Sequence, residues 1–337
     1  MTALFTAPSV DEIIAKLGAQ STCDAGLTQD PWHFDTTTPS YGPGASMLDR
    51  LPANAPRQQV LPDEYRKASD EELQQRISDA KQRLGSKLLI LGHFYQRDEI
   101  IKHADFVGDS FQLAKNATER PDADHIVFCG VHFMAETAKV LCPDKKVLIP
   151  CPEAGCSLAE SCDAAAFAAF KAKYPGYKVV SYVNTSVGVK ALTDVCCTSS
   201  NALKVVESIP ADQPIIFAPD RNLGSYIQKL TGRENMVIWD GACHVHEEFS
   251  LEKILELKRQ HPAAQVVVHP ECRAYIVQVA DFVGSTAAIL DYCGKSSARE
   301  FIVVTEAGIL TEMKRRYPEK TFIPAPPDDE ACGCNNC

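Results

Sequence analysis

The sequence has no apolar run that approaches the ~20 residues needed to cross a bilayer. Its N-terminus, MTALFTAPSVDEIIAKLG, has no basic stretch leading into a long apolar segment, so it lacks the pattern of a signal peptide. Basic residues are too few to balance the acidic ones, and the net charge is −10. Because nucleic-acid binding relies on a basic surface, this charge argues against nucleic acid as the main partner. We predict a cytoplasmic protein with no nucleic-acid or membrane partner, which leaves a small anionic substrate open.

What the chain does have in unusual number is cysteine, with 14 among 337 residues. In a secreted protein such a count suggests disulfides, but in a cytosolic chain of this size it suggests metal or redox chemistry. Six cysteines lie in apolar runs or helices, and most of them are expected to be small buried side chains. These six are Cys129, Cys142, Cys196, Cys197, Cys272 and Cys293. A metal site is therefore to be sought among the other thiols.

The motif ADFVG occurs twice, at residues 104–108 and 280–284, and a hydroxyl-bearing turn follows each copy. A segment of the same design, KVVSYVNTSVGVKALTDVCCTS, lies between them. The aligned aspartates Asp105, Asp194 and Asp281 are 89 and 87 residues apart. Self-similarity at a fixed period is the sequence signature of repeated structural units. We predict a threefold repeat; the alternative is that all βα units share such patterns.

Each repeat contains four short, nearly continuous apolar runs separated by helical stretches. This pattern is typical of buried parallel strands joined by crossover helices. We therefore predict an α/β fold of three pseudo-symmetric α/β/α units, each with a roughly four-stranded parallel sheet, arranged as a triangle around a central cluster site. The predicted limits are 1–72 for an N-terminal extension, then 73–161, 162–249 and 250–337 for the three units.

A cysteine-containing turn follows the last strand of each predicted unit. The cysteines chosen are Cys156, Cys243 and Cys337, spaced 87 and 94 residues apart. Ligands of α/β sheets gather outside the carboxyl ends of the strands, so three equivalent turns can deliver one thiolate each to a central point. Three thiolates leave one position of a soft metal centre open, which suits a [4Fe–4S] cluster whose free iron acts as a Lewis acid.

The tail CGCNNC leaves other interpretations open. It fits a zinc half-site or a regulatory disulfide, and Cys332 or Cys334 can take the place of Cys337 as the third ligand.

Ten ordered motifs resemble the quinolinate synthase family over residues 73–337. They are GHFYQRDEI, FVGDS, VHFMAETAKVL, PEAGCSL, YVNTS, CTSSNA, APDRNLG, GACHVHEEF, HPEC and VGST. The resemblance implies three homologous α/β/α units around a [4Fe–4S] cluster with three cysteine ligands. It also implies that iminoaspartate and dihydroxyacetone phosphate condense to quinolinate, with loss of phosphate and water. An aspartate-oxidising enzyme is implied as a functional partner, because iminoaspartate is short-lived. Family members normally continue beyond the last ligand, whereas this chain ends at Cys337.

Acid and base groups are expected at the strand ends of the first and third units. A carboxylate beside an imidazole at a strand end is a plausible general base, and Glu271, next to His269 in HPEC, is the first choice. By family likeness, His93 and Tyr95 in GHFYQ move protons on the triose. A strand-end His-x-Tyr pair can instead be a hydrogen-bonded pair without catalytic function.

Substrate-binding groups are expected at the same places in the repeat. Tyr182 and Asn184 suit carboxylate binding through O–H and N–H donors. The recurring turns present hydroxyls and N–H groups at helix N-termini, where anions are seated, although simple helix capping is the alternative. The turn residues chosen are Asp109, Ser110, Ser199, Ser285 and Thr286. His246, three residues after Cys243, is expected to reach the substrate beside the cluster.

Other functions remain open at this stage. An aconitase-like hydro-lyase would use the same open iron on another small polycarboxylate. A zinc- or disulfide-regulated binding protein would use the thiols without catalysis. Radical S-adenosylmethionine chemistry is disfavoured because the chain has no C-x3-C-x2-C motif.

Overall fold

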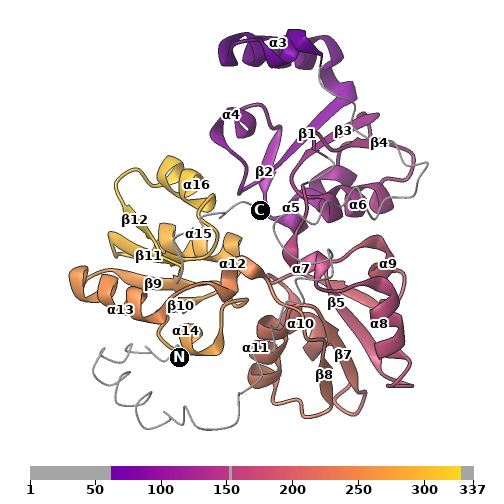
Figure 1. Cartoon of the computed structure of the whole chain (residues 1–337), viewed down its shortest axis with the longest axis vertical. Helices are drawn as coiled ribbons and strands as arrows, with labels where there is room; N and C mark the ends of the chain where they lie inside the picture. Colours follow the sequence, from indigo (N-terminus) through magenta and orange to yellow (C-terminus); the bar gives the residue numbers. More distant parts are fainter. Residues whose placement is uncertain (1–61, 152–153, 328–337) are drawn as a thin grey trace.

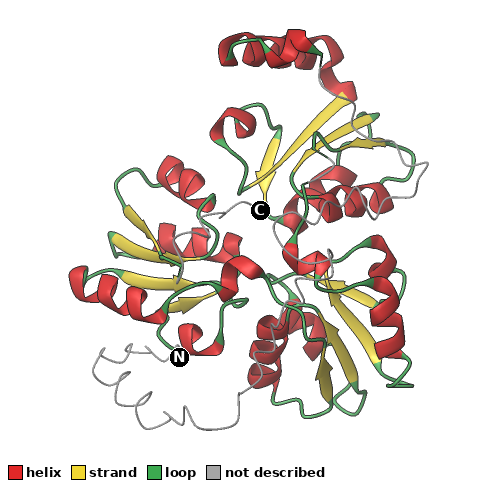
Figure 2. Ribbon diagram, viewed as in Figure 1, coloured by secondary structure: helices red, strands yellow, loops and turns green. Residues whose placement is uncertain are grey.

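Three parallel sheets with helices on both faces form the fold. The computed structural model describes residues 62–151 and 154–327. Figure 1 shows the three sheets at the corners of a triangle, and Figure 2 shows helices on both sides of each. The predicted arrangement of three α/β/α units is confirmed. No helix within 62–151 or 154–327 is long and apolar enough to span a membrane.

Each sheet has four strands with the same order. The first sheet contains β1 (Leu88–His93), β2 (Phe106–Gly108), β3 (His125–Cys129) and β4 (Lys146–Leu148). The second contains β5 (Lys178–Tyr182), β6 (Val195–Cys197), β7 (Ile215–Ala218) and β8 (Met236–Ile238). The third contains β9 (Gln265–Val268), β10 (Phe282–Val283), β11 (Glu300–Val304) and β12 (Thr321–Pro324). The spatial orders are β2-β1-β3-β4, β6-β5-β7-β8 and β10-β9-β11-β12, so the topology repeats three times.

Helices connect the strands of each unit. The first unit has α2 (Asp63–Arg66), α3 (Asp70–Leu84), the 3-10 turn η2 (Gly85–Lys87), α4 (Asp98–Ile101), α5 (Ser110–Thr118), α6 (His132–Leu141) and α7 (Ser157–Glu160). The second has α8 (Ala164–Lys171), α9 (Val187–Lys190), α10 (Ala202–Glu207), α11 (Arg221–Thr231) and α12 (His244–Glu247). The third has α13 (Leu251–Gln260), α14 (Ala274–Val277), α15 (Thr286–Lys295) and α16 (Ile309–Arg316). The helix α3 crosses the predicted limit between residues 72 and 73, and the domain limits stay predictions.

The repeated aspartates tie the first two strands of every sheet together. Each carboxylate accepts a hydrogen bond from a backbone N–H 15 residues earlier in the first strand of its own sheet. The pairs are Ile90 to Asp105 at 2.8 Å, Val179 to Asp194 at 2.7 Å and Val266 to Asp281 at 2.7 Å. The backbone N–H of each aspartate donates in return to the carbonyl of the same strand residue. We call these three pairs the aspartate latches. They confirm the register of the repeat.

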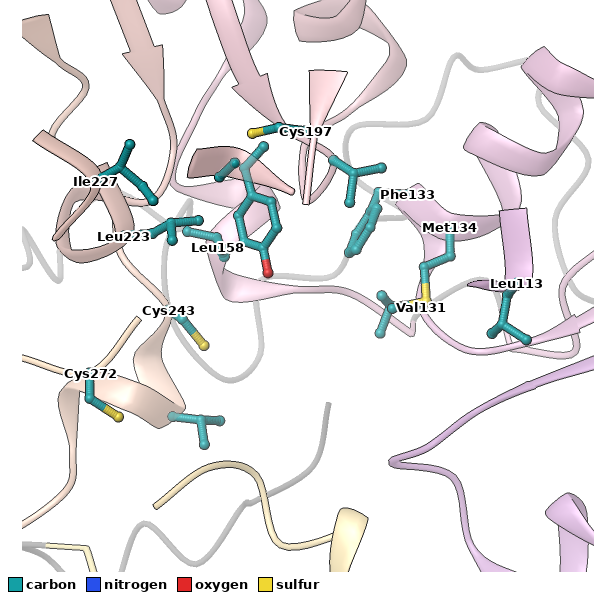
Figure 3. Packing of buried hydrophobic residues seen from close by; sticks show 14 of the residues in the cluster. Leu113, Val131, Phe133, Met134, Leu158, Cys197, Leu223, Ile227, Cys243 and Cys272 are labelled. Carbon is teal, nitrogen blue, oxygen red and sulfur yellow. The ribbon is translucent and has the colours of Figure 1, made fainter. Parts of the chain in front are cut away.

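A buried apolar cluster extends through all three units. It contains Leu91 of β1, Phe217 of β7 and Val268 of β9, so each sheet contributes to one shared core. Figure 3 shows how the α11 residues Leu223 and Ile227, four apart on one helix face, contribute to this cluster. Burying each such side chain contributes about 1.5–3 kcal/mol. The units are therefore held together by the same apolar burial that stabilises each unit alone.

The buried cysteines follow expectation with one exception. Five of the six predicted small buried side chains are buried, but Cys196 is exposed. Its strand β6 lies at the edge of the second sheet, where one face of the strand is open to solvent. This exposure could not be predicted, because a strand as short as VCC shows no alternation of apolar and polar residues.

Candidate active site

One cavity is lined by residues from all three units. All the predicted site residues within the described ranges line it, except Ser285. The lining members are His93, Tyr95, Asp109, Ser110, Cys156, Tyr182, Asn184, Ser199, Cys243, His246, His269, Glu271 and Thr286. These residues lie at or just after the ends of β1, β2, β5, β6, β9 and β10, or in the turns and the short helix α12 that follow β4 and β8. The carboxyl ends of the parallel strands thus converge on a shared site, as expected for α/β sheets.

The first unit contributes His93 and Tyr95, on either side of the buried Phe94. Phe94 packs in the core of the third unit with Phe301 and Ile309, which draws its two neighbours to the boundary between these units. Backbone N–H of Tyr95 donates to His93 Nδ1 at 3.3 Å, so the ring proton lies on Nε2. Burial lowers the pKa of His93 to about 4. The imidazole is therefore neutral near pH 7 and can accept or donate a proton.

Glu271 is the centre of the buried polar groups. The hydroxyl of Tyr182 donates to its Oε1 at 2.6 Å, while Oε2 lies 3.3 Å from Nδ1 of His246. Burial by itself would raise the pKa of Glu271, but the imidazoles of His269 and His246 and the hydrogen bond from Tyr182 lower it to about 2. Burial and the adjacent carboxylate together raise the pKa of Tyr182 well above its usual value. The pair is therefore a carboxylate that receives a phenol O–H.

His269 lies between Glu271 and the second unit. Its Nδ1 accepts from the backbone N–H of Glu271 at 3.4 Å, and its Nε2 lies 3.3 Å from Oγ of Ser199. Burial lowers the pKa of His269 to about 4, against the opposing effect of the carboxylate. Its ring lies 4.8 Å from that of His246. Two imidazoles thus flank one carboxylate, an arrangement that orients the rings and stabilises a proton placed on either of them.

Two of the three predicted cysteine ligands fall within the described residues, and they lie at matching positions in their units. Cys156 immediately precedes α7 and Cys243 immediately precedes α12, and both line the cavity. Backbone N–H of Cys243 donates to Oδ2 of the buried Asp220 at 3.0 Å, which fixes the turn. In Figure 3, Cys243 lies near Leu158 and Leu223 at the edge of the shared core. Burial raises the pKa of Cys156 to about 11, so a bound cation is needed to hold it as thiolate.

The donor set around Cys243 is compatible with metal binding. Ligand atoms of Cys243, His246 and Glu271 lie within 4.8 Å of one another, and all three residues are buried. The buried Nδ1 of His246 has no aligned hydrogen-bond partner among the described residues, although the Glu271 carboxylate lies close to it. Such an atom is rare in folded proteins. The predicted third thiol, Cys337, and its alternatives Cys332 and Cys334 lie outside the described residues.

The hydroxyl turns fall into two groups. Ser110 and Thr286 are the first residues of α5 and α15, and both line the cavity. Ser285 instead caps α15, accepting from Ala288 N–H at 3.2 Å and lying 3.0 Å from Oγ of Ser200. Its predicted role in substrate binding stays a prediction.

The turn of the second unit differs from the expected one. Here α10 begins only at Ala202, so Ser199 lies before the helix and not at its first turn. The reason is a local hydrogen bond, since Asn201 Oδ1 accepts from the N–H of Thr198 at 2.7 Å. In the first unit, Asp109 and Gln112 form a reciprocal capping box at the start of α5.

Sequence analysis missed the residues that follow the third strand of the second and third sheets. Asp220 follows β7 and holds Cys243, as described above. Thr305 follows β11, is 3% exposed and lies 3.1 Å from Nε2 of His246. Its neighbour Glu306 is 2% exposed, and burial raises its pKa to about 8. The signal available was positional: the strand ends of PIIFAP and FIVVTE face the same edge of the sheet as the first two strands.

Comparison with known proteins identifies the family of this chain. A family model described as Quinolinate synthetase A protein matches residues 75–337. The quinolinate synthase of Thermosynechococcus vestitus is 57% identical over 261 residues, which cover 77% of this chain and 81% of that protein. That of Chloroherpeton thalassium is 55% identical over 249 residues, covering 74% and 77%. A solved structure of E-1-hydroxy-2-methyl-but-2-enyl-4-diphosphate reductase from Plasmodium falciparum covers 76% of this chain and 88% of its own, at 10% identity and a TM-score of 0.30, too low to support an inference. By the family match and these identities, the chain belongs to the quinolinate synthetase A protein family.

Proposed function

We propose that this chain is a quinolinate synthase, a transferase that condenses iminoaspartate with dihydroxyacetone phosphate to quinolinate, with loss of phosphate and water. Relatives that carry this name are 54–57% identical over about three quarters of the chain. The observation that carries the proposal is one cavity in which Glu271, three imidazoles, two tyrosines and two thiols meet. We place the reaction in the cytoplasm, coupled to an enzyme that oxidises aspartate.

Three cysteines would hold the cofactor, a [4Fe–4S] cluster. Cys156 and Cys243 fit this role because they line one cavity from matching positions, and Cys337 is proposed as the third ligand. When bound, a cluster with three protein ligands supplies one open iron as a Lewis acid for a departing oxygen. The crowding of Cys243, His246 and Glu271 supports a metal centre at this end of the cavity.

The anionic groups of the substrates would be bound by neutral donors. Tyr182 ends β5 and Asn184 follows it, and Ser110 and Thr286 are the first residues of α5 and α15. Helices of nine and ten residues present free N–H groups and a positive dipole end, which favour carboxylate and phosphate. This arrangement explains how a chain with a net charge of −10 receives anions without a lysine at the site.

Proton transfer would use the buried imidazoles. His93 carries its proton on Nε2 and is neutral, so with Tyr95 it can exchange protons with the triose. Glu271, with its low pKa, is a weak base by itself but stabilises the imidazolium that forms when His246 or His269 takes a proton. Glu271 as the general base stays a proposal, in which the carboxylate and the imidazoles act as one unit.

An apolar wall would protect the intermediates from water. Val131, Phe133 and Met134, around the start of α6, line the same cavity and belong to the shared core. Their burial removes water from one side of the site. This matters because an imine such as iminoaspartate is lost by hydrolysis.

The test is direct. The chain is purified without oxygen, its iron and sulfide are counted, and quinolinate is measured from dihydroxyacetone phosphate and iminoaspartate that is generated in situ by an aspartate-oxidising enzyme. We expect four irons per chain and stoichiometric release of phosphate. Hydration or dehydration of a small polycarboxylate, without quinolinate formation, would instead show a hydro-lyase. A colourless zinc-containing chain with full activity would exclude the cluster.

A further inference from the structure

Behind the cavity, one buried hydroxyl contacts two of the proposed reacting groups. Thr305 follows β11 and is 3% exposed. Its Oγ1 lies 3.1 Å from Nε2 of His246 and 3.5 Å from the hydroxyl of Tyr95. Thr305 is absent from the cavity wall, so it contacts these side chains from behind. His246 comes from the second unit and Tyr95 from the first, whereas Thr305 belongs to the third.

The direction of these hydrogen bonds follows from the carboxylate on the far side of the ring. Oε2 of Glu271 lies 3.3 Å from Nδ1 of His246, and a buried carboxylate favours a proton on the nearer ring nitrogen. Nε2 is then an acceptor, and the Thr305 hydroxyl donates to it. The threonine oxygen can in turn accept from Tyr95, whose hydroxyl also lies 2.9 Å from Oγ1 of Thr286.

The turn that carries Thr305 is itself fixed against Tyr95. A side-chain carbon at Gly308 would lie 2.6 Å from Cα of Tyr95 and 2.7 Å from Oε2 of Glu306. Backbone N–H of Gly308 donates to that carboxyl oxygen at 2.7 Å. Only glycine allows so close an approach of the two backbones. The position of Thr305 relative to Tyr95 is therefore set by backbone contact.

We propose that Thr305 is a positioning residue, which holds the imidazole of His246 and the phenol of Tyr95 in register through its single hydroxyl. The proposal deepens the proposed function and rests on it. His246 has one edge toward Glu271 and Cys243, and without a partner on Nε2 its ring can rotate about the Cβ–Cγ bond. A misplacement of about 1 Å at a reacting group costs as much as a hundredfold in rate.

Two variants isolate the hydroxyl. Thr305→Ser and Thr305→Ala both lose the methyl group, but only the alanine variant loses the O–H. We expect kcat of Thr305→Ala to fall about tenfold to a hundredfold below that of Thr305→Ser, with KM of both substrates within threefold and iron content equal. The serine variant is expected to keep kcat within about threefold of the unaltered chain.

A control removes a half-buried, hydrogen-bonded hydroxyl away from the site. Thr193 Oγ1 lies 2.7 Å from Oγ of Ser181 and 2.8 Å from the carbonyl of Val189, and it does not line the cavity. Thr193→Ala should lower the melting temperature while leaving kcat unchanged.

Crystal structures of both Thr305 variants, grown without oxygen, supply a readout independent of turnover. We expect the His246 ring to keep its orientation in the serine variant and to rotate in the alanine variant. Equal kcat in the two variants, or an unrotated ring in Thr305→Ala, would overturn the proposal. If the unaltered chain makes no quinolinate, the proposed function fails, and ring orientation still decides the role of Thr305.

Discussion

The buried carboxyl of Glu306 should make the protein less stable as the pH rises. It is 2% exposed and accepts one hydrogen bond from Gly308 N–H, and within the described part of the chain no charged group offsets its burial. Burial raises its pKa from 4.5 to about 8. Between these values the unfolded chain has released the proton and the folded chain keeps it. The unfolded state therefore binds fewer protons, so stability is lost as the pH rises from 4.5 to about 8.

The size of this effect follows from the two pKa values of Glu306. Each pKa unit corresponds to about 1.4 kcal/mol, so ionisation costs about 1 kcal/mol of stability at pH 5.5, about 3 kcal/mol at pH 7 and about 4 kcal/mol at pH 8. Glu306→Gln removes the ionisation but keeps an oxygen for Gly308 N–H. The added amide N–H groups carry a penalty that does not change with pH. The gain of the variant over the unaltered chain should thus grow by about 3 kcal/mol between pH 5.5 and 8.

The assay for Glu306→Gln is the melting temperature of both chains, purified without oxygen, at half-unit pH steps from 5.5 to 8. At about 2 °C or less per kcal/mol for a chain of this size, the difference between them should widen by about 5 °C. Glu312→Gln is the matched control. Glu312 is similarly buried on α16, but Arg315 and Arg316 lower its pKa against the effect of burial. The melting-temperature difference between Glu312→Gln and the unaltered chain should therefore stay constant over this pH range. If the melting-temperature difference between Glu306→Gln and the unaltered chain does not change with pH, the reasoning is refuted.

Three further predictions concern the site and the frame. Tyr182→Phe removes a 2.6 Å hydrogen bond to the Glu271 carboxylate, which is worth about 1.5–3 kcal/mol. In steady-state assays kcat/KM should therefore fall about tenfold to a hundredfold, and a change below threefold would contradict this. Cys243→Ala should lose most of its iron in a colorimetric count, whereas the exposed Cys196→Ala should keep all of it; equal iron in both would remove Cys243 from the ligand set. Asp194→Ala leaves a strand N–H unpaired, so chemical denaturation should show a loss of about 1–3 kcal/mol, with kcat kept in the folded fraction.

The fold could be predicted from the sequence because its signals are local and occur three times. Each apolar run that follows a helix of ordinary capping chemistry became a parallel strand, and the spacing of Asp105, Asp194 and Asp281 gave the register. Repetition reduces ambiguity, since a short apolar run is uninformative alone but decisive when two others lie at the same offset. The repeat also identified the strand ends, which is why most of the predicted site residues line one cavity.

What could not be predicted depends on contacts between units. Thr305 is an ordinary strand-end residue in FIVVTE, and only the packed structure shows His246 and Tyr95 against it. The low pKa of Glu271 has a local cause in His269, but it also depends on His246 and Tyr182, which belong to another unit. The exposure of Cys196 depends on strand order, which a run of three residues does not encode.

The frame and the site are linked by the aspartate latches. The latched strand residues Ile90, Val179 and Val266 are equivalent, so the residues three positions later, His93, Tyr182 and His269, occupy equivalent strand ends. Yet each of these ends carries different chemistry.

Four of the side-chain contacts at the site run between units. The pairs are Tyr95 with Thr286, Tyr182 with Glu271, His269 with Ser199, and His246 with Thr305. A single unit therefore has the strand ends but none of these partners. The site exists only where three packed units meet, so any change that loosens the shared core should lower activity before it unfolds an individual sheet.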